Sequence, residues 1–176
     1  MRTFETEYKS FQQRFFNLKN FVFLALFIFY TYLIFNFKLL IPLYSIIIEL
    51  ILSVFFITCI IYKSKTNIHI ITFDEKKILL EGETFNKKWK KSINILETEI
   101  ILKSIGSRTG ICGVIFYIKF KNLKNTYTLN LFETFSDEKI LEIFNEFKRL
   151  KEEKIIIDEK IILNRIQEKI EKCPFQ

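Results

Sequence analysis

Two long apolar stretches constrain this chain more than any other feature of its sequence. Residues 21–37 hold no charged side chain, and residues 39–62 hold only Glu49. As α-helices, at about 1.5 Å per residue, these stretches are roughly 25 Å and 36 Å long. The hydrocarbon core of a bilayer is about 30 Å thick. The sequence therefore predicts two transmembrane helices that follow each other as a hairpin.

We place the two helices at about 18–37 and 41–62, within a membrane segment of residues 21–62. Pro42 suits the first turn of the second helix, where a missing backbone N–H costs nothing. A cleaved signal peptide is the alternative for the first stretch, because basic residues precede it. The stretch is long and aromatic, however, lacks a small-residue cleavage site, and is followed at once by a second apolar stretch.

Basic residues indicate the orientation of this hairpin. Four lie within residues 1–20, Lys63 and Lys65 follow the second helix, and only Lys38 lies in the turn between the helices. Cytoplasmic flanks carry the excess of Lys and Arg. We therefore expect a two-pass protein of the inner (cytoplasmic) membrane with both termini in the cytoplasm. The net charge of +7 attracts such a chain to the anionic leaflet.

The N-terminal residues 1–20 show a helical period. Phe4, Tyr8, Phe11, Phe15 and Leu18 recur at spacings of four, three, four and three, which places them on one face of a helix. We expect an amphipathic helix that lies on the membrane surface or continues into the first span. Packing against the soluble domain is the alternative.

Residues 66–153 have the pattern of an α+β domain. Val114–Lys121 and Thr126–Leu131 alternate in polarity, as antiparallel strands do. Ser136 is an N-cap candidate for a helix whose apolar stripe is Ile140, Phe144, Phe147 and Leu150.

Residues 154–176 form a C-terminal extension that we expect to be partly helical. Asn164–Lys172 has a helical period, whereas Ile155–Ile157 and Ile161–Leu163 are also compatible with a hairpin.

Two spans, about six short strands and one amphipathic helix follow one another in this order. The hairpin Ile70–Leu80, the segment Trp89–Ile93 and the helix start Thr134–Ile140 carry the pattern. In these features the chain resembles the bacterial membrane-anchored PH-like proteins, particularly the YcxB-like group, over Ile68 to Lys151. The resemblance implies an antiparallel sheet capped by a C-terminal helix, in a non-enzymatic module with no catalytic residue.

The most basic cluster of the sequence is a candidate for membrane-surface or partner binding. Lysine next to an anionic leaflet is stabilised by about 1 kcal/mol, and tryptophan favours the interface. The alternative is a solvated strand whose tryptophan enters the core. Nucleic-acid binding is not expected, because no such motif surrounds the cluster. Its residues are Lys87, Lys88, Trp89, Lys90 and Lys91.

The glycine-rich segment Gly106–Gly110 carries Arg108 at its centre. It lacks the Gly-Lys-Ser/Thr ending and the strand–loop–helix context of a phosphate-binding loop. We interpret it as a hairpin loop in which Arg108 is available to a lipid phosphate or a protein partner.

Glu49 is an acid inside a predicted span, and such residues usually face other protein groups. Ser45 and Ser53 lie four residues to either side and extend a polar stripe. Equal depth in the hairpin places Glu49 near Tyr30–Thr31. We expect a structural hydrogen bond that fixes the hairpin or a homo-oligomer, with a proton or ion path as the alternative.

The remaining chemistry of the sequence is sparse. Cys59, Cys112 and Cys173 are scattered and odd in number, which predicts reduced thiols without a disulfide framework. His69 is the only histidine, so we expect no metal site, no cofactor and no catalytic residue.

The sequence thus favours a membrane-tethered, non-enzymatic interaction module that binds a protein partner or the anionic membrane surface. An immunity-type protein that neutralises a membrane-targeting toxin is the alternative, and an oligomeric channel a weaker one.

Overall fold

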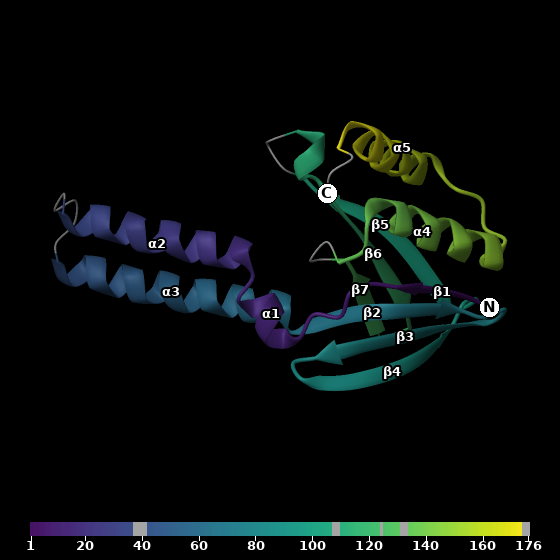
Figure 1. The fold of residues 1–176 in the computed structure, drawn as a ribbon, viewed down its shortest axis with the longest axis horizontal. Coiled ribbons are helices and arrows are strands. Elements are labelled where there is room, and N and C mark those ends of the chain that lie inside the picture. Colours follow the sequence, from purple (N-terminus) through teal and green to yellow (C-terminus); the bar gives the residue numbers. More distant parts are fainter. Residues whose placement is uncertain (37–41, 107–109, 124, 131–133, 174–176) are drawn as a thin grey trace. The chain divides into compact units, whose positions relative to one another are not determined.

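The computed structural model describes residues 1–36, 42–106, 110–123, 125–130 and 134–173 (Figure 1). The chain divides into two compact units. One consists of Met1–Tyr8 together with Asn67–Gln176, and the other of Lys9–Thr66. The first unit is an α+β domain, and the second is helical.

The α+β domain begins with a strand that the sequence did not predict. Strand β1 (Arg2–Glu5) pairs antiparallel with β2 (Thr66–Phe73), with Glu5 opposite Ile70. In the sequence, residues 6–65 therefore separate two strands that are neighbours in one sheet. The helical unit is an insertion into a β-hairpin.

The predicted helix over residues 1–20 is thus wrong for its first half. Phe4 is buried, and its ring meets Phe73 edge to face at 5.9 Å. The helix α1 is confined to Phe11–Phe15, where Ser10 and Gln13 form a capping box. Pairing with β2 decides the conformation of β1, since strand contacts outweigh a local helical period in so short a segment.

Within the described residues, seven strands form two antiparallel sheets. The first sheet has the order β1-β2-β3-β4 and the second β5-β6-β7. The prediction of an antiparallel α+β domain is confirmed, with two sheets in place of one. The remaining strands are β3 (Lys77–Thr84), β4 (Lys87–Asn94), β5 (Thr98–Ile105), β6 (Ile115–Asn122) and β7 (Asn125–Leu129).

The core follows the alternation that the sequence shows. Phe116, Ile118 and Phe120 of β6 are fully buried, whereas the residues between them are only half-buried. Helix α4 (Asp137–Lys151) begins as predicted, with Ser136 accepting a hydrogen bond from the backbone N–H of Lys139. Its apolar stripe packs on this face of the sheet, with the rings of Phe120 and Phe147 at 5.9 Å.

Helix α5 (Ile157–Lys172) belongs to the domain and is more than an extension of it. It begins seven residues earlier than predicted, and the alternative hairpin is absent. It lies beside α4 (Figure 1) and buries Ile166 completely. The domain therefore extends beyond residue 153, because α5 belongs to the same compact unit and Ile166 is part of its core.

The helical unit contains α2 (Leu18–Asn36) and α3 (Pro42–Ser64), which lie side by side and run in opposite directions (Figure 1). Phe27 and Phe56 stack between them, with ring centroids 6.1 Å apart. In the part of the chain that the structure describes, one helical segment is long and apolar enough to cross a membrane, Ile47–Ser64. Almost none of it is buried.

Candidate interaction surface on strand β4

The basic cluster lies on β4, which is the edge strand of the first sheet. Among the residues that the structure describes, no strand therefore pairs with the outer hydrogen-bonding side of its backbone in that sheet. Lysine on an edge strand also prevents unwanted pairing with other chains. The side chains define what we call the β4 surface: exposed Lys87, Lys88, Lys90 and Lys91, and half-buried Trp89.

Trp89 lies across β3 because its partner there is a glycine. Gly82 is opposite Trp89 in the strand register, and a Cβ at Gly82 would lie 2.5 Å from Cζ2 of the indole. The indole Nε1 donates a hydrogen bond of 2.9 Å to Oγ1 of Thr84. The ring also approaches Tyr127 at 6.2 Å. Trp89 is therefore anchored in the domain while part of its surface stays accessible.

We expect Gly82→Ala to destabilise the domain by about 1–3 kcal/mol, the range for overpacked sites. The added Cβ meets the indole and, at 2.6 Å, the backbone oxygen of Asn67, so neither neighbour can move freely. Urea denaturation measures the loss of stability, and the emission wavelength of the single tryptophan reports displacement of the indole. Gly106→Ala is the matched control, because a Cβ there meets nothing within 4 Å. Equal stability of the two variants would contradict this packing.

Acidic residues on β3 compensate part of the basic charge. The register places Glu83 opposite Lys88 and Glu81 opposite Lys90, and Lys90 forms an ion pair of 2.5 Å with Glu81. Four lysines and two glutamates leave the surface with a formal charge of +2. Its attraction for anions is therefore weaker than the sequence of β4 alone suggests.

Three side chains from distant parts of the sequence, Tyr8, His69 and Glu83, contact one another next to Lys88 of this surface. Glu83 is 2% exposed and accepts a hydrogen bond from the Tyr8 hydroxyl. The Lys88 amine lies 5.3 Å from the centre of the Tyr8 ring, and the His69 ring lies 5.4 Å from it. Sequence reasoning missed Tyr8 and Glu83. Along β3, the period of two places Glu83 on the same face of the strand as Glu81, and this signal could have indicated it. No local signal links Tyr8 to β4.

Lys91 approaches two aromatic rings of the domain. Its amine is 6.0 Å from the centre of the Trp89 ring and 5.6 Å from that of Tyr127. Cation–π contacts of this kind hold the lysine near the aromatic rings. Arg108, the other predicted member of the surface, lies outside the described residues.

The predicted polar stripe on α3 is brought together in part. Glu49 and Ser53 are half-buried, whereas the three side chains between them are exposed. They therefore share the face of α3 that also carries Phe56. The side chain of Ser45 lies outside the described residues.

The stack of Phe27 on Phe56 gives a second estimate of which residue of α2 lies at the same depth along the hairpin as Glu49. Glu49 precedes Phe56 by seven residues, or about 10 Å along the helix. The same distance along the antiparallel α2, counted from Phe27, reaches Ile34 in place of Tyr30–Thr31. Ser53 is the polar residue nearest the level of Thr31.

A second polar cluster, unpredicted by the sequence, joins α4 to α5. Lys169 is 2% exposed. Its amine donates to Asp137 Oδ2 and to the Val114 backbone oxygen, both at 2.8 Å. It also lies 5.8 Å from the centre of the Phe116 ring. The signal was available, since Lys169 follows Ile166 by three residues on the buried stripe of α5.

Lys148 and Glu146 of α4 carry shifted pKa values. Burial disfavours the charge of Lys148, but the hydrogen bonds that it donates to Glu159 and Glu153 outweigh burial and raise its pKa. Hydrogen bonds from Arg149 hold the pKa of the Glu146 carboxyl below its ordinary value, against the opposing effect of burial. Both groups therefore act as fixed charges near neutral pH.

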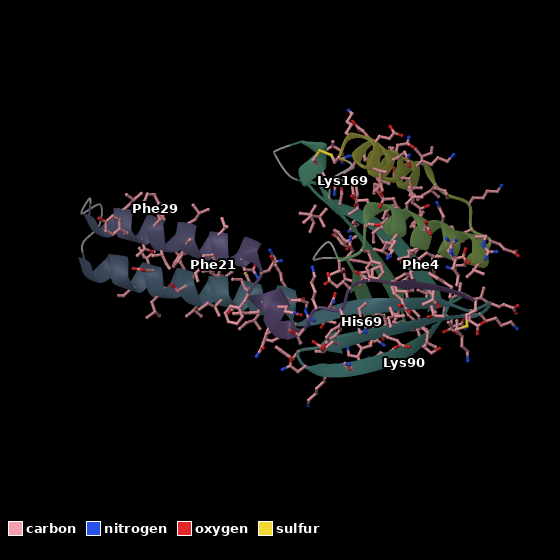
Figure 2. All side chains as sticks on the ribbon, viewed as in Figure 1. Phe4, Phe21, Phe29, His69, Lys90 and Lys169 are labelled. Atoms are coloured by element: carbon pink, nitrogen blue, oxygen red, sulfur yellow. A yellow bond between two sulfur atoms is a disulfide. The ribbon has the colours of Figure 1, made fainter. Side chains whose placement is uncertain are left out.

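The cysteines also differ from the prediction. Cys112 and Cys173 form a disulfide across 61 residues, with Cα atoms 5.8 Å apart (Figure 2). The expectation of three reduced thiols is wrong for this pair, and Cys59 is free. Spacing in the sequence could not reveal the bridge, because only the folded domain brings the two Cα atoms within bonding range.

The described residues contain no group of three or more His, Cys, Asp or Glu side chains suited to hold a metal ion. No protein-family model, curated protein or solved structure matches this chain. The geometry and charge of the β4 surface are therefore the features of the molecule that bear on its function.

Proposed function

We propose that this chain is a membrane-tethered, non-enzymatic interaction module whose β4 surface binds the anionic headgroups of the inner membrane. In this proposal α2 and α3 form a two-pass hairpin, and both termini are cytoplasmic. The single observation that carries the lipid contact is the exposed, lysine-rich edge strand with an accessible indole at its centre.

The exposed surface of the helical unit supports the two-pass hairpin. Phe21 and Phe29 of α2 are 65% and 58% exposed (Figure 2), and α3 exposes apolar side chains along most of its length. So large an apolar surface is unfavourable in water. At about 1.5 Å per residue, the 19 residues of α2 are roughly 28 Å long, close to the bilayer core.

The PH-like identity of the domain is part of the same proposal. Four plus three antiparallel strands followed directly by a helix support it. On this assignment the membrane helices are an insertion after the first strand, and α5 is an addition to the capping helix.

The connection to the membrane favours lipid over a soluble partner. Only Lys65 and Thr66 separate the last helical residue of α3 from Asn67, where the second segment of the domain begins. Two residues reach about 7 Å, so the domain stays within reach of the headgroups however it is turned. A basic surface held at that distance meets anionic lipid at high local concentration.

The chain contains one tryptophan, so Trp89 reports on the β4 surface without labelling. The full chain is reconstituted in nanodiscs with spin-labelled headgroups, in neutral or partly anionic lipid. We expect stronger quenching of Trp89 in anionic discs, and loss of the difference at 1 M salt, where the Debye length is about 3 Å.

Replacing all four lysines of the β4 surface with glutamine is expected to abolish this difference. At about 1 kcal/mol per lysine, and less for the ion-paired Lys90, the contact loses roughly 3 kcal/mol, or about 100-fold in population. The matched control replaces four exposed lysines elsewhere on the domain, Lys76, Lys77, Lys154 and Lys160. Equal quenching of the wild type in neutral and anionic discs would sink the lipid contact and favour an acidic protein partner.

A further inference from the structure

We infer that the Cys112–Cys173 disulfide is a reversible redox latch that holds the C-terminal end of α5 on the domain. This inference rests on the proposed cytoplasmic location, where thiols are normally kept reduced and disulfides are mostly transient or redox-sensing. The observations that carry it are the position of the bridge, its accessibility and the nature of the other contacts of α5.

The bridge joins two peripheral segments of the domain. Cys112 lies in a short 3-10 turn, η1 (Ile111–Gly113), between β5 and β6. Cys173 is the C-cap of α5. Cys112 is exposed and Cys173 half-buried, so the bridge lies at the surface of the domain and outside its hydrophobic core.

The contacts that hold α5 differ between its two ends. At its N-terminal end Glu159 pairs with Lys148 of α4 at 2.8 Å. In its last two turns Ile166 enters the core, and Lys169 bonds Asp137 and the Val114 backbone. Val114 immediately follows η1, so the disulfide and Lys169 hold the same corner of the domain. When the bridge is open, the burial of Ile166 and the bonds of Lys169 hold this end of the helix without the help of the disulfide.

The chemistry is a two-electron exchange with a dithiol reductant of the thioredoxin class. A reductant thiolate attacks Sγ of Cys112, the S–S bond breaks, and Cys173 leaves as a thiolate that takes up a proton. The second thiol of the reductant then displaces Cys112 from the mixed disulfide. The protein gains two electrons and two protons, and the reductant becomes a disulfide. Closure is the reverse exchange, with a small-molecule disulfide such as oxidised glutathione as the acceptor.

Hydrogen exchange of the full chain in detergent tests the latch. The oxidised chain is compared with the chain equilibrated in a glutathione buffer at the reducing poise of the cytosol. We expect amide exchange at 167–172 to accelerate at least about tenfold on reduction, while exchange in α4 and β6 stays unchanged, since local opening involves only part of a domain. Reoxidation restores the protection.

Two variants distinguish a redox latch from a purely structural disulfide. Cys112→Ser with Cys173→Ser is expected to exchange rapidly at 167–172 in both buffers, whereas Cys59→Ser behaves as wild type. A bridge that stays closed in the reducing buffer, or faster exchange throughout the domain on reduction, would overturn the latch and make the disulfide purely structural.

The location is tested separately. In intact cells treated first with a membrane-impermeant reductant, a membrane-impermeant maleimide is expected to leave Cys112 unlabelled. Labelling from outside would overturn the cytoplasmic location, whatever the exchange experiment shows for the purified chain.

Discussion

A chain in which Tyr8 is joined to Asn67 through an Asn-Gly turn is expected to fold cooperatively without residues 9–66. In β1 and β2 Glu5 faces Ile70, and the backbone N–H of Thr6 bonds the oxygen of His69 at 3.0 Å. Continuing this register brings Tyr8 opposite Asn67. A two-residue Asn-Gly turn closes such an antiparallel pair with the correct twist.

Residues 66–153 alone are expected to lack a cooperative thermal transition. This fragment omits β1, which buries Phe4, and α5, which buries Ile166. Each side chain contributes about 1.5–3 kcal/mol, and together they approach the roughly 5 kcal/mol total of a marginal domain. The fragment also leaves Asp137 without Lys169. Circular dichroism melts of the joined chain and the fragment provide the measurement. A cooperative melt of the fragment at the same temperature would show that β1 and α5 are dispensable.

Lys169→Ala is expected to lower the free energy of unfolding by about 3–5 kcal/mol, the cost of breaking a buried ion pair from one side. The substitution leaves Asp137 and the Val114 carbonyl without their partner and opens space beside Phe116. Urea denaturation of the oxidised chain in mild detergent, followed by Trp89 fluorescence, measures the loss.

Two further variants identify its cause. Lys169→Met keeps most of the side-chain volume and is expected to lose less stability than alanine. Lys172→Ala removes a lysine of the same helix that is exposed and pairs with Glu168 at the surface, so it should behave as wild type. If Lys169→Ala were no less stable than Lys172→Ala, the buried pair would not contribute to the docking of α5.

Elements with strong local signals were predicted from the sequence. The alternation over Val114–Lys121 gives β6, and the Ser136 cap followed by an apolar stripe gives α4. The positions of α2 and α3 follow from the lengths of the two apolar stretches. In each case the interactions that favour the conformation involve residues a few positions apart. A short stretch of sequence therefore shows them.

The sequence predicted which residues of β4 form the candidate surface, but not which residues of the neighbouring strand pair with them. The lysines of the β4 surface are exposed, as a basic segment suggests. Trp89 was expected either to contact the membrane surface or to enter the core. It does part of each, since it is anchored in the domain and still partly accessible. Compensation by Glu81 and Glu83 depends on the strand register. Register is fixed by turn geometry and by the buried face of the sheet, and neither is visible in the basic segment itself.

The sequence by itself determined where the apolar helices, the hairpin strands and the capped helix α4 lie, because periodicity and capping are local properties. Only the tertiary structure decided that Arg2–Glu5 is a strand, that Lys169 is a buried ion-pair partner and that Cys112 meets Cys173. Each of these depends on a contact between residues more than 30 positions apart. The free energy of such contacts comes from burial and pairing that exist once the chain has closed those loops. A local pattern can place Lys169 on the buried stripe of α5, but it does not identify the residue with which a side chain pairs.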